Sequence, residues 1–257
     1  MKAPHRRIVL KAPWEIERLR AANRVVAEVL AELAAAVGPG QTTADLDRMT
    51  REGIERRGGK PAFLGYHGYP ASLCVSINEE VVHGIPSPRR RIADGDLVSM
   101  DVGAVVDGYY GDAALSVIVG EHPGSTAARL VEVTRRCLDA GIAEARPGRH
   151  LQDISAAIQG VVEAAGFSVV RKFVGHGIGT ALHEPPEVPN FGRPGQGPRL
   201  RPGMVLAIEP MVNEGGPDVR VLEDGWTAVT ADGKLSAHFE HSVAITEDGP
   251  VVLSRLD

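Results

Sequence analysis

An internal repeat constrains the fold of this chain more than any other feature of its sequence. One offset of 108 positions connects landmarks of the first half to landmarks of the second half. The matched pairs are Pro39-Gly40 and Pro147-Gly148, Asp45-Leu46 and Asp153-Ile154, Gly58 and Gly166, Gly95 and Gly203, and Asp101 and Glu209. A single offset across helix stops, helix starts, turns and a strand acid predicts that one helix-helix-strand-strand unit occurs twice. If the halves face each other, the strands that carry Asp101 and Glu209 meet at a pseudo-twofold axis.

The 257 residues suit one large α/β domain. We therefore predict a single domain over residues 1–257, with the repeat covering roughly 13–120 and 124–245. Apolar residues at helical spacing, together with capping residues, predict two helix pairs. The first pair covers about 13–37 and 42–57, and the second covers about 125–145 and 150–165.

The composition excludes several classes of protein. A net charge of -5 gives no electrostatic footprint for nucleic acid, and two cysteines without a C-x-x-C pair are typical of a reducing cytoplasm. The apolar run at residues 8–10 is too short for a signal peptide, and the alanine-rich segment at 25–37 contains charged residues, which argues against a membrane span. The basic residues before that short run are Lys2, His5, Arg6 and Arg7.

Two carboxylates lie in a predicted β-hairpin of otherwise apolar or small residues. Residues 97–106 form a buried-strand pattern, Asp107-Gly108 is a strong hairpin-turn signal, and the chain returns over 109–119. Asp101 and Asp112 should therefore lie nearly opposite each other. Two buried anions at that distance need a proton or a cation between them. The alternative is that they are an ordinary strand-end and a solvated aspartate.

Three further groups occur at positions that could join this pair. They are His176 within Gly175-His176-Gly177-Ile178-Gly179, Glu209 after the apolar run 204–208, and Glu240 before the strand-like residues 242–245. Four carboxylates and one imidazole suit two divalent ions that share a bridging water or hydroxide, with Mn, Fe(II), Co and Zn all compatible. His183-Glu184 does not begin a helical zinc motif, because Pro185-Pro186 follows.

The order of these motifs resembles the type I methionine aminopeptidases of the short bacterial form, over essentially the whole length. The motifs are Tyr66-His67-Gly68-Tyr69-Pro70, His83-Gly84-Ile85-Pro86, Asp101-Val102-Gly103, Gly111-Asp112, the His176 segment, Ile208-Glu209-Pro210, Asp224-Gly225-Trp226-Thr227 and Glu240-His241. This resemblance implies an α/β (α+β) pita-bread fold, with two pseudo-symmetric helix-helix-strand halves around a central antiparallel sheet.

The resemblance also implies the site residues. The ligands of two divalent ions would be Asp101, Asp112, His176, Glu209 and Glu240, with Asp112 and Glu240 bridging. His83 would hydrogen-bond the scissile amide, His183 would contact the carbonyl side, and Glu209 would carry the proton of the bridging water. The methionine side chain would be enclosed by Phe63, Tyr66, Tyr69, Cys74, Leu182 and Trp226. Among these, Phe63 and Leu182 depart from the usual pattern of the family.

Such an enzyme would remove initiator methionine from nascent polypeptides whose second residue is small. The resemblance implies a cytoplasmic monomer with a transient ribosome contact and no binding to nucleic acid or membrane. Related X-Pro aminopeptidases and prolidases usually carry a large preceding domain, and type II methionine enzymes an extra helical insertion; neither is evident here. A metal-free pita-bread binding protein is a further alternative, which the complete ligand set disfavours. The Gly/Pro-rich residues 185–202 fit a substrate-side loop or a connector.

Overall fold

The structure, a computed structural model, describes residues 7–256, so Lys2, His5 and Arg6 of the basic N-terminal stretch lie outside it. The two predicted helix pairs are confirmed to within about one residue at each end. They are α1 (Pro13–Ala36), α2 (Thr43–Arg56), α3 (Thr126–Glu144) and α4 (Leu151–Ala164). No helix within residues 7–256 combines the length and apolar character that crossing a bilayer requires.

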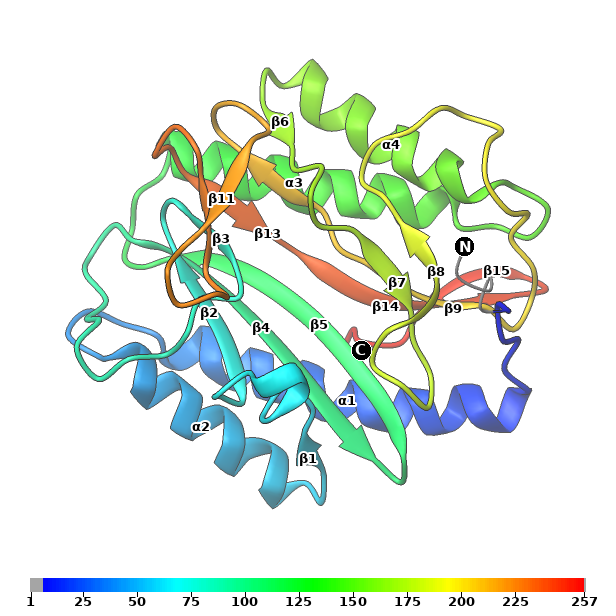
Figure 1. Ribbon diagram of the computed structural model, residues 1–257, viewed down its shortest axis with the longest axis horizontal. Coiled ribbons are helices and arrows are strands. Elements are labelled where there is room, and N and C mark those ends of the chain that lie inside the picture. Colours follow the sequence, from blue (N-terminus) through cyan, green and yellow to red (C-terminus); the bar gives the residue numbers. More distant parts are fainter. Residues whose placement is uncertain (1–6, 257) are drawn as a thin grey trace.

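A nine-stranded antiparallel sheet runs between the two helix pairs (Figure 1). Its main path has the order β1-β4-β5-β14-β9-β7-β8, while β2 pairs with β4 and β15 with β14. These strands are β1 (Lys60–Pro61), β2 (Leu73–Ile77), β4 (Leu97–Val106), β5 (Tyr109–Ile118), β7 (Gly175–Gly177), β8 (Glu184–Val188), β9 (Val205–Ile208), β14 (Glu240–Thr246) and β15 (Gly249–Val252). The arrangement confirms the predicted fold class.

Two small antiparallel sheets and one short helix complete the described chain. One sheet has the order β13-β10-β6 and the other β11-β12-β3. Their strands are β3 (Glu80–Val82), β6 (Ser168–Val169), β10 (Met211–Asn213), β11 (Val219–Val221), β12 (Ala228–Thr230) and β13 (Ser236–His238). The short helix η1 (Tyr66–Gly68) precedes β2 and begins with Tyr66, one of the predicted pocket residues.

Hydrogen bonds in the two halves recur at the offset of the repeat. The Gly40 amide donates to Ile92 O and the Gly148 amide to Leu200 O, while the guanidinium of Arg91 donates to Gly40 O and that of Arg199 to Gly148 O. Both members of each pair are separated by 108 positions. These matched contacts support the internal duplication, which stays a prediction.

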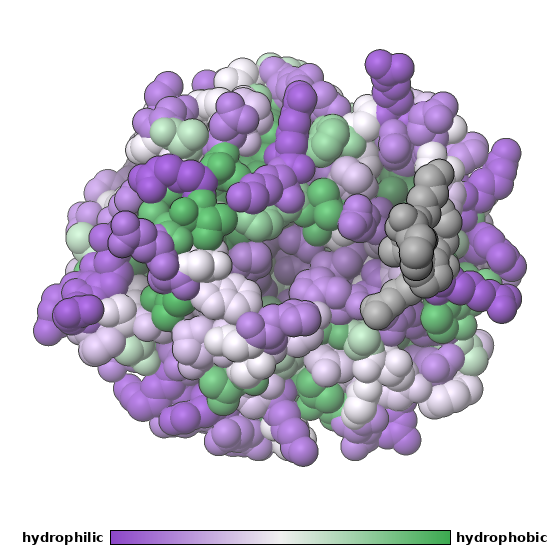
Figure 2. Space-filling model, viewed as in Figure 1, coloured by the Kyte–Doolittle hydropathy of each residue, from purple (hydrophilic) through white to green (hydrophobic). Residues whose placement is uncertain are grey.

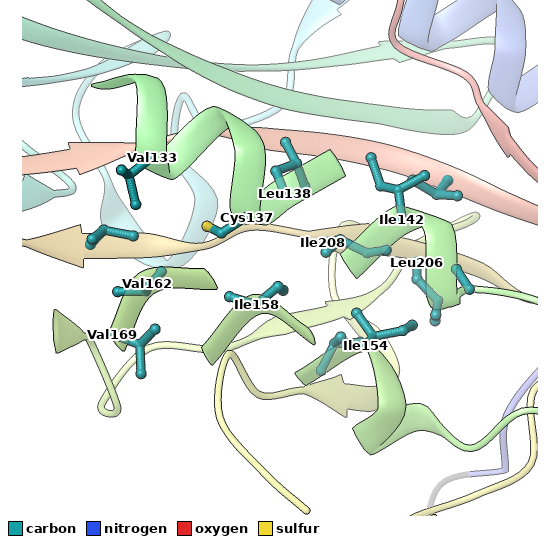
Figure 3. Close-up of a cluster of buried hydrophobic side chains, with 14 of the residues drawn as sticks. Val133, Cys137, Leu138, Ile142, Ile154, Ile158, Val162, Val169, Leu206 and Ile208 are labelled. Atoms are coloured by element: carbon teal, nitrogen blue, oxygen red, sulfur yellow. The ribbon is translucent and has the colours of Figure 1, made fainter. Parts of the chain in front are cut away.

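Each half has a hydrophobic core of its own. Side chains of α1 and α2 pack on β2 and β4 in one half, and those of α3 and α4 pack on β9 and β14 in the other. Figure 3 shows the second core, in which Leu138 of α3 and Ile154 and Ile158 of α4 lie beside Leu206 and Ile208 of β9. The helices therefore cover the outer side of the sheet in both halves, and polar groups can gather on the other side.

Candidate metal centre and adjoining pocket

The hairpin of β4 and β5 brings the first two carboxylates to one face of the sheet. Asp107 and Gly108 both have positive φ angles, 49° and 81°, as a two-residue type I′ turn requires. This turn pairs Asp101 with Ala114 and Gly103 with Asp112. Asp101 and Asp112 are therefore diagonal neighbours on the same face, offset by two residues from direct pairing.

Glu240 joins the same row of the sheet from the neighbouring strand. It is the first residue of β14 and pairs with Ala114, which on its other side pairs with Asp101. Residues in one row project to the same face, so Asp101 and Glu240 flank a residue whose side chain is only a methyl group. The small alanine leaves space between the two carboxylates.

The second half supplies His176 and Glu209. His176 lies in β7 and pairs with Ala207 of β9, and Glu209 directly follows β9. The imidazole Nε2 of His176 lies 3.5 Å from Glu209 Oε1 and 3.8 Å from Asp112 Oδ2. Its Nδ1 lies 2.9 Å from the carbonyl of Gly177, which can only accept. Nδ1 therefore carries the proton, and the lone pair of Nε2 faces the carboxylates.

Buried hydrogen bonds hold the backbone of these acids in place. The side-chain oxygen of Asn23 in α1 accepts from the amide of Asp112, and the hydroxyl of Ser242 in β14 donates to the carbonyl of Asp112. The amide nitrogen of Asn190 donates to the carbonyl of Glu209. Groups from both halves thus hold the backbone of Asp112 and Glu209.

The electrostatics of the four carboxylates call for a cation. One oxygen each of Asp101, Asp112 and Glu240 is buried without a hydrogen-bond partner. Burial raises the pKa of Asp101 to about 7. Burial and the neighbouring carboxylates also raise the pKa values of Asp112, Glu209 and Glu240. Among residues 7–256, His176 is the sole basic side chain within ion-pair distance of any of them.

These donors fit divalent metal ions. Carboxylate oxygens and a neutral imidazole are ligands that Mn, Fe, Co and Zn accept in proteins. Donor atoms of Asp112, His176 and Glu240 lie within 4.8 Å of one another, and so do donor atoms of Asp101, His238 and Glu240. A cation placed among them would partner the orphaned oxygens and relieve the repulsion between the acids.

All the residues predicted for the site line one cavity of about 260 Å³. Figure 2, which has the same view as Figure 1, shows a hollow in the middle of the molecule, and the floor of the hollow is mostly hydrophilic. The predicted side chains around the cavity are Phe63, Tyr66, Tyr69, Cys74, His83, Asp101, Asp112, His176, Leu182, His183, Glu209, Trp226 and Glu240. The carboxylates thus share one concave site with the aromatic residues, which is the usual form of a small-molecule or peptide-end pocket.

Two further histidines, His83 and His183, line the same cavity. Burial lowers the pKa of His83 to about 4, with His183 adding repulsion, and burial also lowers the pKa of His183. Both rings are therefore neutral at pH 7. Tyr66 Oη lies 2.7 Å from His183 Nδ1, and burial raises the pKa of Tyr66, so its hydroxyl keeps the proton and donates it. His183 then presents its Nε2–H as a donor.

Hydrogen bonds and a ring contact hold the apolar wall in place. The hydroxyl of Tyr69 donates to the carbonyls of Leu73 and Gly84, and its ring meets that of Trp226 edge to face at 5.1 Å. Asp224 holds the turn before Trp226, because its carboxylate accepts from the backbone amides of residues 226 and 227. Aromatic groups fixed in this way form a pocket of defined width.

Two histidines of the site were not predicted. His67 also lines the cavity, with φ 49° and its ring 4.4 Å from that of Tyr66. Its place between two predicted pocket tyrosines was the available signal. His238 lies two residues before Glu240, and the two-residue period of a strand puts both on one side. That spacing could have found it.

Comparisons with known proteins give matches over almost the whole chain. The model of "Metallopeptidase family M24" matches residues 17–247. A methionine aminopeptidase of Clostridium acetobutylicum is 51% identical over 247 residues, 96% of this chain and 98% of the relative. The crystal structure of a methionine aminopeptidase from Thermotoga maritima covers 97% of this chain and 100% of its own, with 50% identity and a TM-score of 0.95.

A more distant structure shares the fold alone. The prolidase from Pyrococcus furiosus has a TM-score of 0.79 at 21% identity, and the match covers 97% of this chain and 66% of the prolidase. The near-full-length match at about half identity therefore decides the assignment. The chain belongs to metallopeptidase family M24 and, within it, to the methionine aminopeptidases.

Proposed function

We propose that this enzyme removes the initiator methionine from nascent polypeptides whose second residue is small, using two divalent ions. The observation that carries the proposal is the convergence of four carboxylates, two buried (Asp112 and Glu240) and two half-buried (Asp101 and Glu209), and a neutral imidazole beside an apolar pocket. Asp101, Asp112, His176, Glu209 and Glu240 would hold the ions, with Asp112 and Glu240 shared between them. The ions would supply Lewis-acid stabilisation of negative charge and a nucleophile at neutral pH.

The chain's own residues would divide the remaining work. Glu209, whose carboxylate lines the same cavity, would take a proton from the attacking water and pass it to the leaving amine. The Nε2–H of His183 would donate to the scissile carbonyl, where negative charge develops. Neutral His83 would hydrogen-bond the scissile amide. No arginine or lysine lines the described pocket, so these neutral donors orient the peptide.

The pocket accounts for a methionine side chain. Phe63, Tyr66, Tyr69, Cys74, Leu182 and Trp226 provide apolar and aromatic surface. Methionine is unbranched and its polarizable sulfur packs well on aromatic rings, so it would fill a narrow pocket of this kind. Burial raises the pKa of the Cys74 thiol well above its usual range, so Cys74 would act as a small apolar wall residue.

The cellular setting is part of the same proposal. We infer a cytoplasmic monomer that meets nascent chains through a transient ribosome contact, binding neither nucleic acid nor membrane. The support is the low net charge, the absence of a membrane-spanning helix among residues 7–256, and the family itself. Co, Mn, Fe(II) and Zn all suit the donor set.

Methionine release from defined peptides tests the function. Chelated enzyme, reloaded with Mn, Co, Fe(II) or Zn, is offered Met-Ala-Ser, a Met-Pro-initiated peptide and an Ala-Pro-initiated peptide. We expect metal-dependent cleavage of both methionine peptides and none of the Ala-Pro peptide. Cleavage of the Ala-Pro peptide alone would move the chain to the X-Pro group, and no cleavage with any metal would favour a binding protein.

Two variants test the site. Asp101→Asn removes one charge from the carboxylate row, and His176→Ala removes the imidazole, while circular dichroism checks that each variant is folded. Each should lose methionine release by about 10²-fold or more, because the geometry of the nucleophile depends on both groups. Undiminished activity in both folded variants would overturn the ligand assignment.

A further inference from the structure

His238 lies beside the metal centre, and the proposed mechanism gives it no role. It is the last residue of β13, and its side chain is buried, with 1% of the residue exposed. One of its ring nitrogens lies within 4.8 Å of carboxylate oxygens of Asp101 and Glu240. Asp112, His176 and Glu240 form the other group with this property. The two groups share Glu240, and each contains one imidazole and two carboxylates.

The hydrogen bond of His238 fixes its tautomer. Nδ1 lies 3.2 Å from the carbonyl of Pro210, which can only accept, so Nδ1 carries the proton. Nε2 is then the nitrogen with the free lone pair. His176 is arranged in the same way, with Nδ1 donating to the carbonyl of Gly177. A backbone carbonyl on the other ring nitrogen is the usual means by which proteins orient a metal-binding histidine.

The backbone of His238 is fixed as firmly as its ring. The hydroxyl of Ser116 in β5 donates to the carbonyl of His238 and accepts from its amide, at 2.8 and 2.9 Å. Ser116 is itself hydrogen-bonded to Ser99 of β4. The hairpin strands that carry Asp101 and Asp112 thus also position His238, so the ring is held before any ion binds.

The acceptors around His238 need a proton or a cation between them. Asp101 Oδ1 and Glu240 Oε1 are buried without hydrogen-bond partners, and the free nitrogen of His238 can only accept. One ligand atom from each of these three residues lies within 4.8 Å of the other two, so the residues can share one positive ion. We propose that Nε2 of His238 is a sixth metal ligand, which together with Asp101 and Glu240 holds one of the two ions. The inference rests on the proposed two-metal centre.

This assignment changes the chemistry of that ion. Without His238 it would have oxygen ligands alone, a set that suits Mg and Mn. With His238, each of the two ions has one imidazole nitrogen, and the preference of the pair shifts toward Fe(II), Co and Zn. A residue that cannot bind metal at position 238 would therefore change which metal ions the centre prefers.

Nitrogen hyperfine coupling to bound Mn(II) gives a direct test. One equivalent of Mn(II) is added to chelated His176→Ala protein and examined by pulsed electron paramagnetic resonance. We expect an imidazole nitrogen coupling that disappears in His176→Ala/His238→Asn. Bound Mn(II) with no such coupling in the single variant would overturn the proposal.

A second comparison applies if His176→Ala does not fold. Wild type loaded with Mn(II) at both sites should then show more nitrogen coupling than His238→Asn loaded in the same way. Equal coupling in the two proteins would overturn the proposal.

Metal affinity supplies a second readout. Asparagine at 238 keeps an N–H near the position of Nδ1, so the bond to Pro210 can persist while the free nitrogen is lost. Calorimetric titration with Co(II) or Zn(II) should show one of two sites weakened by about 10-fold or more. His238→Gln serves in the same assay if the asparagine variant does not fold.

The matched control is His241→Asn. His241 is half-buried and adjoins Glu240, but it belongs to the opposite face of β14, where its ring bonds to Ser254. It should bind both ions as wild type does. Equal weakening in His241→Asn would assign the effect to a disturbed strand, and unweakened His238 variants would overturn the ligand role. Wild type that binds no divalent ion would instead overturn the two-metal function itself.

Discussion

At the scale of single residues, Gly103 and Phe63 determine the width of the pocket together. Gly103 lies in β4 opposite Asp112, and a Cβ atom at Gly103 would lie only 2.5 Å from Cε1 of the Phe63 ring. A large aromatic group at 63 is therefore accommodated because the strand beside it has no side chain. The unusual phenylalanine and the glycine form one packing unit.

Gly103→Ala should push the Phe63 ring toward the cavity. We expect a loss of about 1–3 kcal/mol in unfolding free energy from overpacking. The KM for Met-Ala-Ser should rise, because the ring that moves lines the methionine pocket and carries no catalytic group. Urea denaturation and steady-state kinetics measure the two effects. Gly103→Ala/Phe63→Leu should recover part of both, and a wild-type KM in the single variant would contradict the shared packing.

Residues whose position depends on local signals could be predicted from the sequence. The Asp107-Gly108 turn and the strand pattern placed Asp101 and Asp112 on one face, and the two-residue loop explains their offset, because it pairs residue 106 with 109 and hence 101 with 114. His67 and His238 were missed. His67 lies in a short helix with an unusual φ, which periodicity does not report. His238 lies at a two-residue spacing from Glu240 that does report it, and its bond to Pro210 depends on a distant segment.

At the scale of elements, helix α1 and strand β5 approach each other at Gly111. A Cβ atom there would lie 2.6 Å from the backbone carbon of Ala22 and the nitrogen of Asn23. This close approach lets the side chain of Asn23, fully buried, accept from the amide of Asp112 at 3.2 Å. The outer helix thus contributes to the position of a carboxylate on the inner side of the sheet.

Gly111→Ala should separate these two elements. The clash involves helix backbone, which cannot rotate away, so we expect a loss of about 1–3 kcal/mol in unfolding free energy. Metal affinity should fall as well, because Asp112 would lose its contact with Asn23. Thermal denaturation and metal titration measure both.

Gly160→Ala is the control for the Gly111 prediction. Gly160 lies on the exposed side of α4, and a Cβ atom added to it would meet no other atom within 4 Å. Alanine should therefore stabilise that helix by about 0.5–1 kcal/mol. Metal binding should be unchanged in this variant. If Gly111→Ala and Gly160→Ala had the same effect, close packing of α1 on β5 would not be the cause.

At the scale of the whole molecule, the candidate metal centre lies where the two halves join. Asp101 and Asp112 come from the first half, and His176, Glu209 and Glu240 come from the second. Each half has its own core, and β5 pairs with β14 across the junction. Ions held by both sets of ligands would therefore link the halves and offset the repulsion that the folded chain otherwise concentrates at its centre.

Metal removal should for this reason make stability depend on pH. The pKa of Asp101 is raised to about 7 in the folded, metal-free chain, against about 3.9 for an unfolded aspartate. Between these values the folded state binds more protons, so its stability is lost as pH rises toward and through 7. Asp112, Glu209 and Glu240, whose pKa values are also raised by burial and by one another, add to this loss.

The window from pH 7.5 to 8.5 isolates the carboxylates from the histidines. Burial lowers the pKa values of His83 and His238 to about 4, and an unfolded histidine has a pKa of about 6.5, so in this window the rings are largely neutral in both states. Chelated protein should lose up to about 1.4 kcal/mol per pH unit for each carboxyl group that titrates, while protein saturated with Mn(II) should not. Denaturation midpoints in EDTA and in Mn(II) should therefore diverge as pH rises.

Asp101→Asn should reduce the divergence, because it removes a charge that raises the pKa values of the other three acids. Parallel curves for the two wild-type samples would show that the buried carboxylates do not control the stability of the metal-free fold.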